Sequence, residues 1–316
     1  MFSIRRDVWR GKRAKHASPL RPTAAIIICV DISSLVQGYS KGLYSSWLHY
    51  KPDHLLVDCG EGCASSLGNS GYAIERVLLT HGHIDHIAGL PVLLWARAAG
   101  MGDNEKPLQI YYPRDDQYIA DMMQFLERTR AKVAFDLQFI SLDENASIPL
   151  TESGTHARRI TTFATQHMIG RLTLGYKILE TRSRLKIEYS KCAQNELRDL
   201  SMSGAALSES YEATIAAFGG DGLALNVDDV RDAELLVHEA TILDANDRKH
   251  QLHATVGEAL QVARDANVKT LLLQHFSGRY RTSEIKKCVQ DEAARVGVTC
   301  DVWCLFRDKL WREIAR

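Results

Sequence analysis

The segment from His81 to His86 constrains this chain more than any other, because it carries three imidazoles and one carboxylate within six residues. It directly follows the apolar run Val77–Leu79, which predicts a buried strand. Imidazole is a preferred ligand of zinc, and a carboxylate can also orient a metal-bound water. If the chain leaves the strand extended, His81 and His83 point the same way, while Asp85 and His86 can turn toward a neighbouring position. The loop therefore predicts a metal site with ligands for two ions.

Three further candidate ligands lie downstream, each at the end of a predicted strand. His167 follows the alternating run Ile160–Ala164, and His275 follows the apolar run 270–274. Asp221 alone suggests an ordinary turn residue, but its flanking glycines let the backbone bring a carboxylate close to a metal. Loops at strand ends commonly carry chemistry on a rigid scaffold, and the first loop alone cannot complete two coordination spheres. We therefore expect these three residues to join it.

The H-x-H-x-D-H form of the loop resembles that of the metallo-β-lactamase superfamily, and the resemblance extends from about residue 24 to the end. It implies an α/β fold, the αββα sandwich in which two mixed sheets face each other between outer helices. It also implies two zinc ions per chain. By resemblance, one zinc is held by His81, His83 and His167, the other by Asp85, His86 and His275, and Asp221 bridges them.

The chain also resembles ribonuclease Z, the tRNA 3′-processing endonuclease, in a set of motifs that occur in the family's order. These are Asp58–Gly62, Gly89–Pro91, His238–Thr241 (the family's H-E-A-T), His253–Thr255 (H-S/A-T) and His275–Tyr280 (H-F-S-x-R-Y). The set is more specific than the fold, which lactamases, lactonases, thioesterases, phosphodiesterases and nucleases share. It implies a homodimeric endoribonuclease that removes the 3′ trailer of precursor tRNA by attack of a metal-activated hydroxide.

Individual roles follow from this resemblance and from the chemistry of two-metal sites, which neutralise the attacking and departing oxygens of a phosphodiester. Asp85 is expected to orient the hydroxide and to accept its proton. His253 opens a predicted helix and is expected to contact the scissile phosphate and protonate the leaving 3′-oxygen, with Glu239 holding its tautomer. The alternatives are a surface histidine and a salt-bridged glutamate. Arg279 and Tyr280 are expected to stabilise the site or to contact phosphate.

Three departures from the family pattern bear on these expectations. The family flanks its bridging aspartate with Ser and Thr, whereas glycines flank Asp221, so a hydroxyl group is missing there. The G-Y-R-like element begins at Gly175, eight residues after His167 instead of six. Many members insert a Gly/Pro-rich arm that grips tRNA, but the corresponding stretch 181–216 has no proline and balances five basic residues with five acids. No electrostatic clamp is expected there.

Residues 1–22 form a basic extension. They carry Arg5, Arg6, Arg10, Lys12, Arg13, Lys15 and Arg21 against a single acid, Asp7. No apolar segment follows at signal-peptide spacing, and serine is sparse for a transit peptide. The extension is either a solvated tail or an arm that contacts a phosphate backbone and partly replaces the missing clamp.

Composition limits the remaining possibilities. The 316 residues are 45% hydrophobic and 25% charged, which excludes a mainly disordered chain and suits one large domain, predicted at 23–316. The formal net charge is zero, so any attraction to nucleic acid must come from local patches. Seven cysteines without zinc-knuckle spacing indicate reduced thiols and a cytoplasmic protein. No apolar run approaches the ~20 residues of a membrane span.

The periodicity of apolar residues predicts the main elements. Strands are expected at 25–30, 55–57, 77–79, 109–112, 235–238, 268–273 and 298–305. Helices are expected at 87–99, 116–128, 255–266 and 282–296. The first of these helices is apolar nearly all round, which predicts burial on every side, and the third opens with the capping box Thr255-x-x-Glu258.

Two other functions fit the same motifs. A phosphodiesterase of small nucleotides or other small esters would keep the metals and dispense with an RNA-gripping surface, as the altered aspartate turn and the neutral stretch 181–216 suggest. A non-enzymatic scaffold would retain the fold as a binding module. The presence of every expected metal ligand argues against the scaffold.

Overall fold

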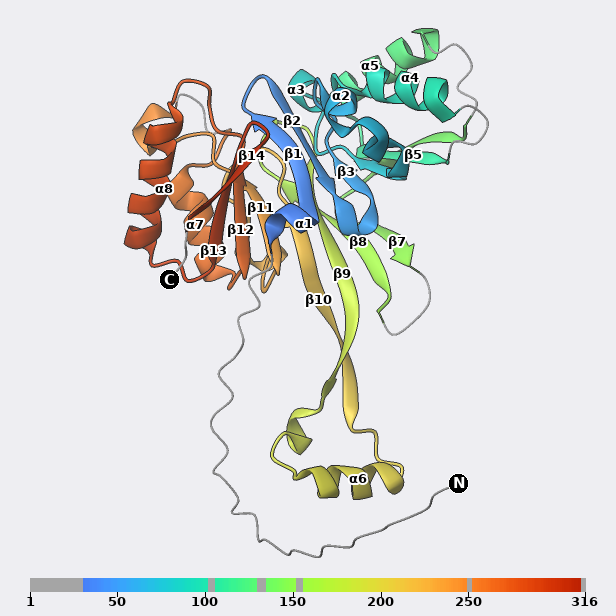
Figure 1. Cartoon of the computed structure of the whole chain (residues 1–316), viewed down its shortest axis with the longest axis vertical. Coiled ribbons are helices and arrows are strands. Elements are labelled where there is room, and N and C mark those ends of the chain that lie inside the picture. Colours follow the sequence, from blue (N-terminus) through green and yellow to red (C-terminus); the bar gives the residue numbers. More distant parts are fainter. Residues whose placement is uncertain (1–30, 102–105, 130–134, 152–155, 249–251, 314–316) are drawn as a thin grey trace, which may run out of the picture. The chain divides into compact units, whose positions relative to one another are not determined.

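Two mixed β-sheets form the framework of the chain in the computed structural model (Figure 1). The structure describes residues 31–101, 106–129, 135–151, 156–248 and 252–313. The basic extension predicted at 1–22 and the strand predicted at 25–30 lie outside these residues. Residues 32–316 form one unit, and the domain boundary at residue 23 stays a prediction.

The first sheet contains six strands in chain order. They are β1 (Val36–Lys41), β2 (Ser45–Tyr50), β3 (Leu55–Val57), β4 (Arg76–Leu78), β5 (Leu108–Pro113) and β6 (Leu137–Leu142). Strands β1 to β3 pair antiparallel, and β3 to β6 pair parallel. The apolar runs predicted at 55–57, 77–79 and 109–112 are therefore the inner strands of a covered parallel sheet, which explains their nearly continuous hydrophobicity.

The second sheet has the order β14-β13-β12-β11-β10-β9-β8-β7. Its strands are β7 (Ser147–Thr151), β8 (Arg158–Thr165), β9 (Thr173–Leu185), β10 (Ser208–Phe218), β11 (Leu235–Glu239), β12 (Thr270–Gln274), β13 (Asp301–Phe306) and β14 (Lys309–Glu313). Strands β10 to β13 run parallel, and the remaining pairs are antiparallel. The four predicted strands that fall here are β8, β11, β12 and β13.

The apolar core is divided between these sheets and their helices. One cluster lies between the sheets and includes Leu78 and Tyr111 from the first and Tyr176 and Leu272 from the second. A second cluster packs the outer face of the first sheet against α2 (Cys63–Leu67), α3 (Ile84–Ile87), α4 (Leu90–Met101) and α5 (Gln117–Thr129). A third packs the second sheet against α7 (Val256–Asp265) and α8 (Thr282–Val296). This arrangement confirms the predicted αββα sandwich.

The helices form where the apolar periodicity predicts them, and one prediction about their burial is wrong. The capping box of α7 is formed, since Thr255 Oγ1 accepts from Glu258 N at 3.1 Å and Glu258 Oε2 accepts from Thr255 N at 2.8 Å. The prediction that α4 is buried on every side is wrong. Val92 and Trp95 are 51% and 71% exposed, because the sheet covers only one face of this helix. Among the described residues, no helix has the length and apolar character to cross a membrane.

The stretch 181–216, where no electrostatic clamp is expected, forms the outer part of a long hairpin. Strands β9 and β10 pair from Tyr176 opposite Phe218 out to Leu185 opposite Ser208, and α6 (Gln194–Met202) closes the tip (Figure 1). Two of its basic residues are ion-paired, Arg182 with Glu180 at 2.7 Å and Arg184 with Glu209 at 2.8 Å. An arm is therefore present in the stretch that corresponds to the family's arm, although its basic and acidic residues are equal in number.

Candidate metal centre

The strand ends of both sheets bring the predicted ligands together. The loop after β4 carries His81 and His83 and leads into α3, which carries Asp85 and His86. The loops after β8, β10 and β12 bring in the remaining three candidates, His167, Asp221 and His275. Groups that could each hold a metal ion are formed by His81, His83 and His167, by Asp85, His86 and His275, and by His81, His86 and Asp221.

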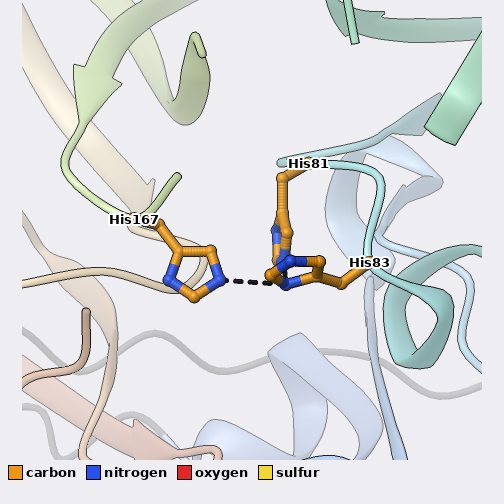
Figure 2. Close-up of side chains that lie close together, drawn as sticks. All are labelled: His81, His83 and His167. Carbon is orange, nitrogen blue, oxygen red and sulfur yellow. Dashed lines mark hydrogen bonds between the residues drawn. The ribbon is translucent and has the colours of Figure 1, made fainter. Parts of the chain in front are cut away.

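The first group is a cluster of three imidazoles (Figure 2). His83 Nδ1 lies 3.0 Å from His81 Nε2 and 3.0 Å from His167 Nε2. One ring nitrogen cannot donate to two partners, because it carries at most one hydrogen. Three converging lone pairs are instead the arrangement that a cation stabilises.

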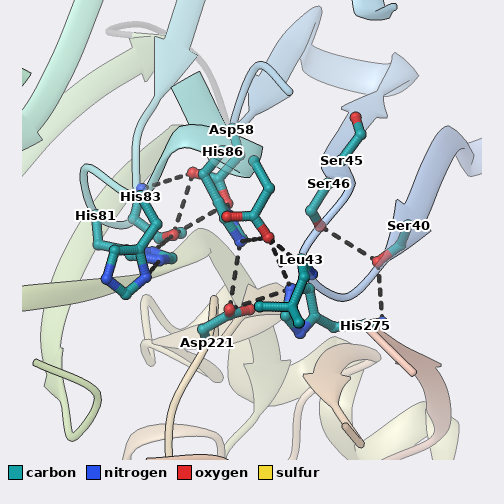
Figure 3. Close-up of polar contacts among 12 residues, drawn as sticks. Ser40, Leu43, Ser45, Ser46, Asp58, His81, His83, His86, Asp221 and His275 are labelled. Atoms are coloured by element: carbon teal, nitrogen blue, oxygen red, sulfur yellow. Dashed lines mark hydrogen bonds and ion pairs between the residues drawn. The ribbon is translucent and has the colours of Figure 1, made fainter. Parts of the chain in front are cut away.

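The second group adds carboxylates to imidazoles (Figure 3). Asp221 Oδ2 lies 3.3 Å from His86 Nε2 and 3.2 Å from His275 Nε2. Asp85 Oδ2 lies 3.7 and 3.5 Å from the same two nitrogens and accepts from the backbone N–H of Leu43 at 3.1 Å. Asp221 also belongs to the group with His81, so its carboxylate lies between the two sets of ligands.

Two histidines have their tautomer fixed by acceptors that cannot donate. His167 Nδ1 lies 2.9 Å from the carbonyl oxygen of Leu252, and His86 Nδ1 lies 2.8 Å from Asp58 Oδ2. Each Nδ1 must therefore carry the hydrogen, which leaves Nε2 of a neutral ring as a lone pair directed at the centre.

Two more histidines are fixed through a threonine hydroxyl. Thr80 Oγ1 donates to Asp58 at 3.0 Å, so it must accept from His81 Nδ1, which is 3.0 Å away. Likewise Thr241 Oγ1 donates to Glu239 Oε2 at 2.6 Å and accepts from His275 Nδ1 at 2.9 Å. Partners of this kind orient metal-binding imidazoles and raise their basicity.

The electrostatics of the centre favour a bound cation. Burial, reinforced by His86, holds the pKa of His81 well below its usual range, so this imidazole is a neutral ligand. Burial alone would raise the pKa of Asp221, but His275 and His86 outweigh it and keep the carboxylate ionised. Burial lowers the pKa of His86, yet Asp221 and Asp58 outweigh it and raise that pKa well above its usual value. Positive charge is therefore stabilised at this point.

Three buried polar atoms of the centre have no hydrogen-bond partner among the described residues. They are His86 Nε2, His275 Nε2 and Asp221 Oδ1. Each would cost roughly 1–3 kcal/mol if left unsatisfied. Neutral nitrogens and an ionised carboxylate together are a donor set that suits zinc and related divalent ions, so the residues present fit the metal that the fold implies.

His253 and Glu239 meet beside this cluster. His253 Nδ1 donates to Glu239 Oε1 at 2.7 Å, as the proposed tautomer requires. Burial lowers the pKa of His253, but the hydrogen bond and charge of Glu239 outweigh it and raise the pKa to about 9. The ring of His253 lies 4.9 Å from that of His167, centroid to centroid. A protonated imidazole is thus held next to the candidate ligands.

Glu239 also fixes the turn that carries Asp221. Its Oε1 accepts from the backbone N–H of Gly222 at 2.8 Å, and the N–H of Leu223 donates to the Gln166 carbonyl at 3.0 Å. Gly220 has φ +63°. The hydroxyl that the family pattern supplies beside the aspartate is absent, and these backbone contacts hold the turn in its place.

The remaining predicted site residues lie differently. The hydroxyl of Tyr280 donates to Asp247 Oδ2 at 2.8 Å, and Arg279 Nη1 contacts the Asp247 carbonyl oxygen at 3.5 Å. Neither belongs to a group that could hold a metal among the described residues. His238 is buried with Nδ1 on the Glu239 carbonyl oxygen and Nε2 on the N–H of Leu225, which is a structural role.

Sequence reasoning missed the residues that orient the ligands. Asp58 is 3% exposed, has φ +57°, and accepts from His86, from Thr80 Oγ1 and from the Thr80 N–H. Thr241 connects His275 to Glu239. Asp58 and Thr241 both lie in motifs that resemble those of the family. These motifs could therefore have indicated that the two residues contribute to the site.

Comparison with known sequences places the chain among ribonucleases Z. A "Ribonuclease Z" of Enterococcus faecalis is 30% identical over 76% of this chain and 82% of that protein. The Arabidopsis thaliana "tRNase Z TRZ2, chloroplastic" is 28% identical over 67% of this chain, and the match spans only 60% of that protein. The family model described as "Anti-Pycsar protein Apyc1" matches residues 41–204.

Solved structures show the same fold. The metallo-β-lactamase fold protein YhfI from Bacillus subtilis aligns with a TM-score of 0.60 at 20% identity, covering 88% of this chain and 98% of that one. Human tRNase Z, short form (ELAC1), aligns with a TM-score of 0.58 at 21% identity, covering 87% and 98%. The chain is a metal-dependent hydrolase that belongs to the ribonuclease Z family of metallo-β-lactamase fold proteins and also to the family described as Anti-Pycsar protein Apyc1.

Proposed function

We propose that this chain is a zinc-dependent endoribonuclease that removes the 3′ trailer of precursor tRNA. The observation that carries the proposal is the convergence of ligands from four separate loops on one buried centre. The names of its relatives, ribonuclease Z and tRNase Z, support precursor tRNA as the substrate.

In this proposal, His81, His83 and His167 would hold one zinc ion, and Asp85, His86 and His275 would hold the other. Asp221 would contribute its carboxylate to both sites. When bound, two such ions lower the pKa of a shared water and neutralise charge on the attacking and departing oxygens of an in-line displacement.

Asp85 receives the proton of the attacking water. Burial raises the pKa of Asp85, but His275 and His86 outweigh it and lower the pKa, so the carboxylate is ionised. The backbone N–H of Leu43 donates to Asp85 Oδ2 at 3.1 Å and fixes the orientation of the carboxylate. An ionised and oriented carboxylate suits a general base.

His253 donates the proton that the leaving 3′-oxygen requires. Its Nδ1 is held by Glu239, so Nε2 is the atom that contacts the phosphate and gives up its hydrogen. Glu239 keeps the ring charged and correctly oriented. Arg279, exposed beside Asp247, and Tyr280 would contact phosphates farther along the RNA, and residues 1–22 would add further backbone contacts.

A second candidate is a phosphodiesterase of small nucleotides. It is favoured by the arm, in which two guanidinium groups are already paired with acids: Arg184 with Glu209 at 2.8 Å and Arg182 with Glu180 at 2.7 Å. Paired cations attract an RNA backbone less than free ones. Turnover of bis(p-nitrophenyl) phosphate without cleavage of precursor tRNA would establish this candidate.

The decisive test is cleavage of a precursor tRNA by the wild type and by Asp85→Ala, with metal content measured in parallel. We expect two zinc ions per wild-type chain, release of the trailer, and a loss of about a hundredfold or more in rate in the variant. A matched control is Asp143→Ala, since Asp143 is an exposed carboxylate paired with Arg114. Wild-type protein with zinc that leaves the tRNA intact would refute the endoribonuclease.

The basic extension has its own test. A chain starting at Thr23 should bind precursor tRNA with a higher KM and a flatter salt dependence than the full chain, because lost phosphate contacts reduce the salt slope. An unchanged KM and an unchanged salt dependence would show that the extension is a solvated tail.

We also propose a homodimer and a cytoplasmic location. Exposed Val92 and Trp95 on α4 support self-association, because grouped apolar side chains are favourable to bury. Sedimentation of the wild type and of Trp95→Asp tests the dimer. Location stays a prediction from the cysteines and would be tested by imaging a tagged protein.

A further inference from the structure

A groove of about 440 Å³ lies beside the metal centre and is not used by the mechanism above. The first wall is the ligand loop with α3, and the other wall is α5. The lining residues are Gly82, His83, Ile84, Ile87, Tyr118, Asp121, Met122 and Phe125. Because His83 belongs both to the groove and to the three-imidazole cluster (Figure 2), a molecule held here would lie directly next to the reacting phosphate.

The two walls are fixed to each other by a buried carboxylate. Asp116 is 2% exposed, and its Oδ2 accepts from the N–H of Gly82 at 2.8 Å while its Oδ1 accepts from the N–H of Tyr118 at 2.9 Å. A side chain at Gly82 would collide with Asp116 and Tyr118, so the walls approach as closely as a glycine allows. The groove is therefore a preformed feature, built into the loop that carries the metal ligands.

Its surface is mainly aromatic and apolar, and Asp121 supplies a carboxylate acceptor. Tyr118 and Phe125 are 47% and 49% exposed, which leaves aromatic surface uncovered. The guanidinium of Arg171 lies 4.8 Å from the Tyr118 ring centroid and can support it in a stack. Asp121 accepts from Gln117 Nε2 at 3.3 Å and retains acceptor capacity, because an ionised carboxylate has about four lone-pair sites.

We propose that this groove binds a nucleobase of the nucleotide that carries the scissile phosphate. The inference deepens the proposed function and rests on it, whichever of the two phosphodiester substrates is correct. A nucleobase is flat, has a π-face that stacks on tyrosine or phenylalanine, and carries ring or amino N–H groups that a carboxylate accepts. An alkyl or acyl group would match the apolar surface but offer no N–H group to the remaining acceptor sites of Asp121.

Two chromogenic esters with the same leaving group show what the nucleobase contributes to catalysis. Thymidine 5′-(p-nitrophenyl phosphate) carries a nucleobase, and methyl p-nitrophenyl phosphate does not. With zinc-loaded full-length protein, we expect Tyr118→Ala and Phe125→Ala to lower the kcat/KM ratio of the first ester to the second by about tenfold to a hundredfold. Met202→Ala is the matched control, since it removes an exposed apolar side chain on α6, outside the groove, and its ratio should equal that of the wild type.

Binding supplies a readout that does not depend on turnover. Calorimetry with thymidine 5′-monophosphate should show weaker binding to Tyr118→Ala than to the wild type or to Met202→Ala. If the wild type cleaves neither precursor tRNA nor either ester yet shows this difference, the proposed function fails and the groove stands. An unchanged ester ratio with unchanged nucleotide binding overturns the groove assignment. Equal losses on both esters with an altered sedimentation coefficient would also overturn it, by assigning the groove to a second copy of the chain.

Discussion

The metal centre and the outer end of the β9–β10 hairpin hold their charged groups in opposite ways. In the centre, Asp58 and Asp221 are 3% exposed and Glu239 is 1% exposed, and the carboxylates of Asp58 and Glu239 each accept from several donors. On the hairpin, the side chains of Arg184 and Glu209 are 62% and 42% exposed, and α6 has no buried residue.

This difference sets how much each region can change. Removing one partner of a buried charged pair costs about 3–5 kcal/mol, whereas an exposed ion pair contributes about 0–1 kcal/mol. The centre is therefore intolerant of substitution, and the hairpin can alter its side chains while the fold persists. In the proposed function, chemistry would take place in the first region, and the second would contact the substrate.

The largest effect is expected from His253→Ala. Loss of a general acid lowers kcat by about 10² to 10⁴, while zinc content stays at the wild-type level because the seven proposed ligands remain. Single-turnover cleavage of precursor tRNA with parallel metal analysis measures both. A variant that loses its zinc would show that His253 supports the centre instead of donating a proton.

The variant Asp58→Ala should have the second largest effect. The His86 and Thr80 donors lose their acceptor, so we expect zinc affinity to fall about 10- to 100-fold. Competition with a fluorescent chelator measures the affinity. Equal affinity in Asp58→Ala and in the exposed control Asp143→Ala would contradict the orienting role of Asp58.

The variant Glu239→Gln tests whether His253 donates a proton, because it changes the pKa of His253 and therefore the pH dependence of the rate. The raised pKa of about 9 keeps the donating form present up to that pH, and without the charge of Glu239 burial lowers the pKa. The alkaline limb of the rate profile should then move toward lower pH, with about a thirtyfold loss at pH 8 if the pKa falls to the ordinary 6.5. An unmoved alkaline limb would remove His253 as the donor.

Removal of the hairpin tip should have the smallest effect. Leu185 and Ser208 are paired in register, so residues 186–207 can be replaced by Asn-Gly, which favours a tight two-residue turn. We expect a KM for precursor tRNA several-fold higher, with thermal stability and ester turnover unchanged. An unchanged KM would favour the small-nucleotide substrate.

The sequence predicted the parts whose signal is local. The apolar runs of β3, β4 and β5 and the capping box of α7 can be recognised within a few residues, and the spacing of the H-x-H-x-D-H loop alone indicates four of the seven proposed ligands. His167, Asp221 and His275 could be ordered by strand ends and resemblance. Their proximity depends on two sheets packing face to face, which the sequence specifies only through the whole core.

Other elements could not be predicted from the sequence, because the residues that stabilise them lie elsewhere in the chain. Strand β2 buries Ser45, Ser46 and His49 along with its apolar residues, so no alternation marks it. Strands β9 and β10 carry Arg and Glu that look like a solvated stretch until their cross-strand register is known. The role of Asp58 depends on a fold-specific contact with α3.

The hairpin joins the sandwich at a particular place. His167 lies just before β9, and Asp221 follows β10 within three residues, so two proposed ligands border the same insertion. Residues added symmetrically beyond the pair Leu185 and Ser208 leave the inner pair Tyr176 and Phe218 in the same register. The length of the tip can therefore change without altering the register at the base of the hairpin, which lies next to the loops that carry His167 and Asp221.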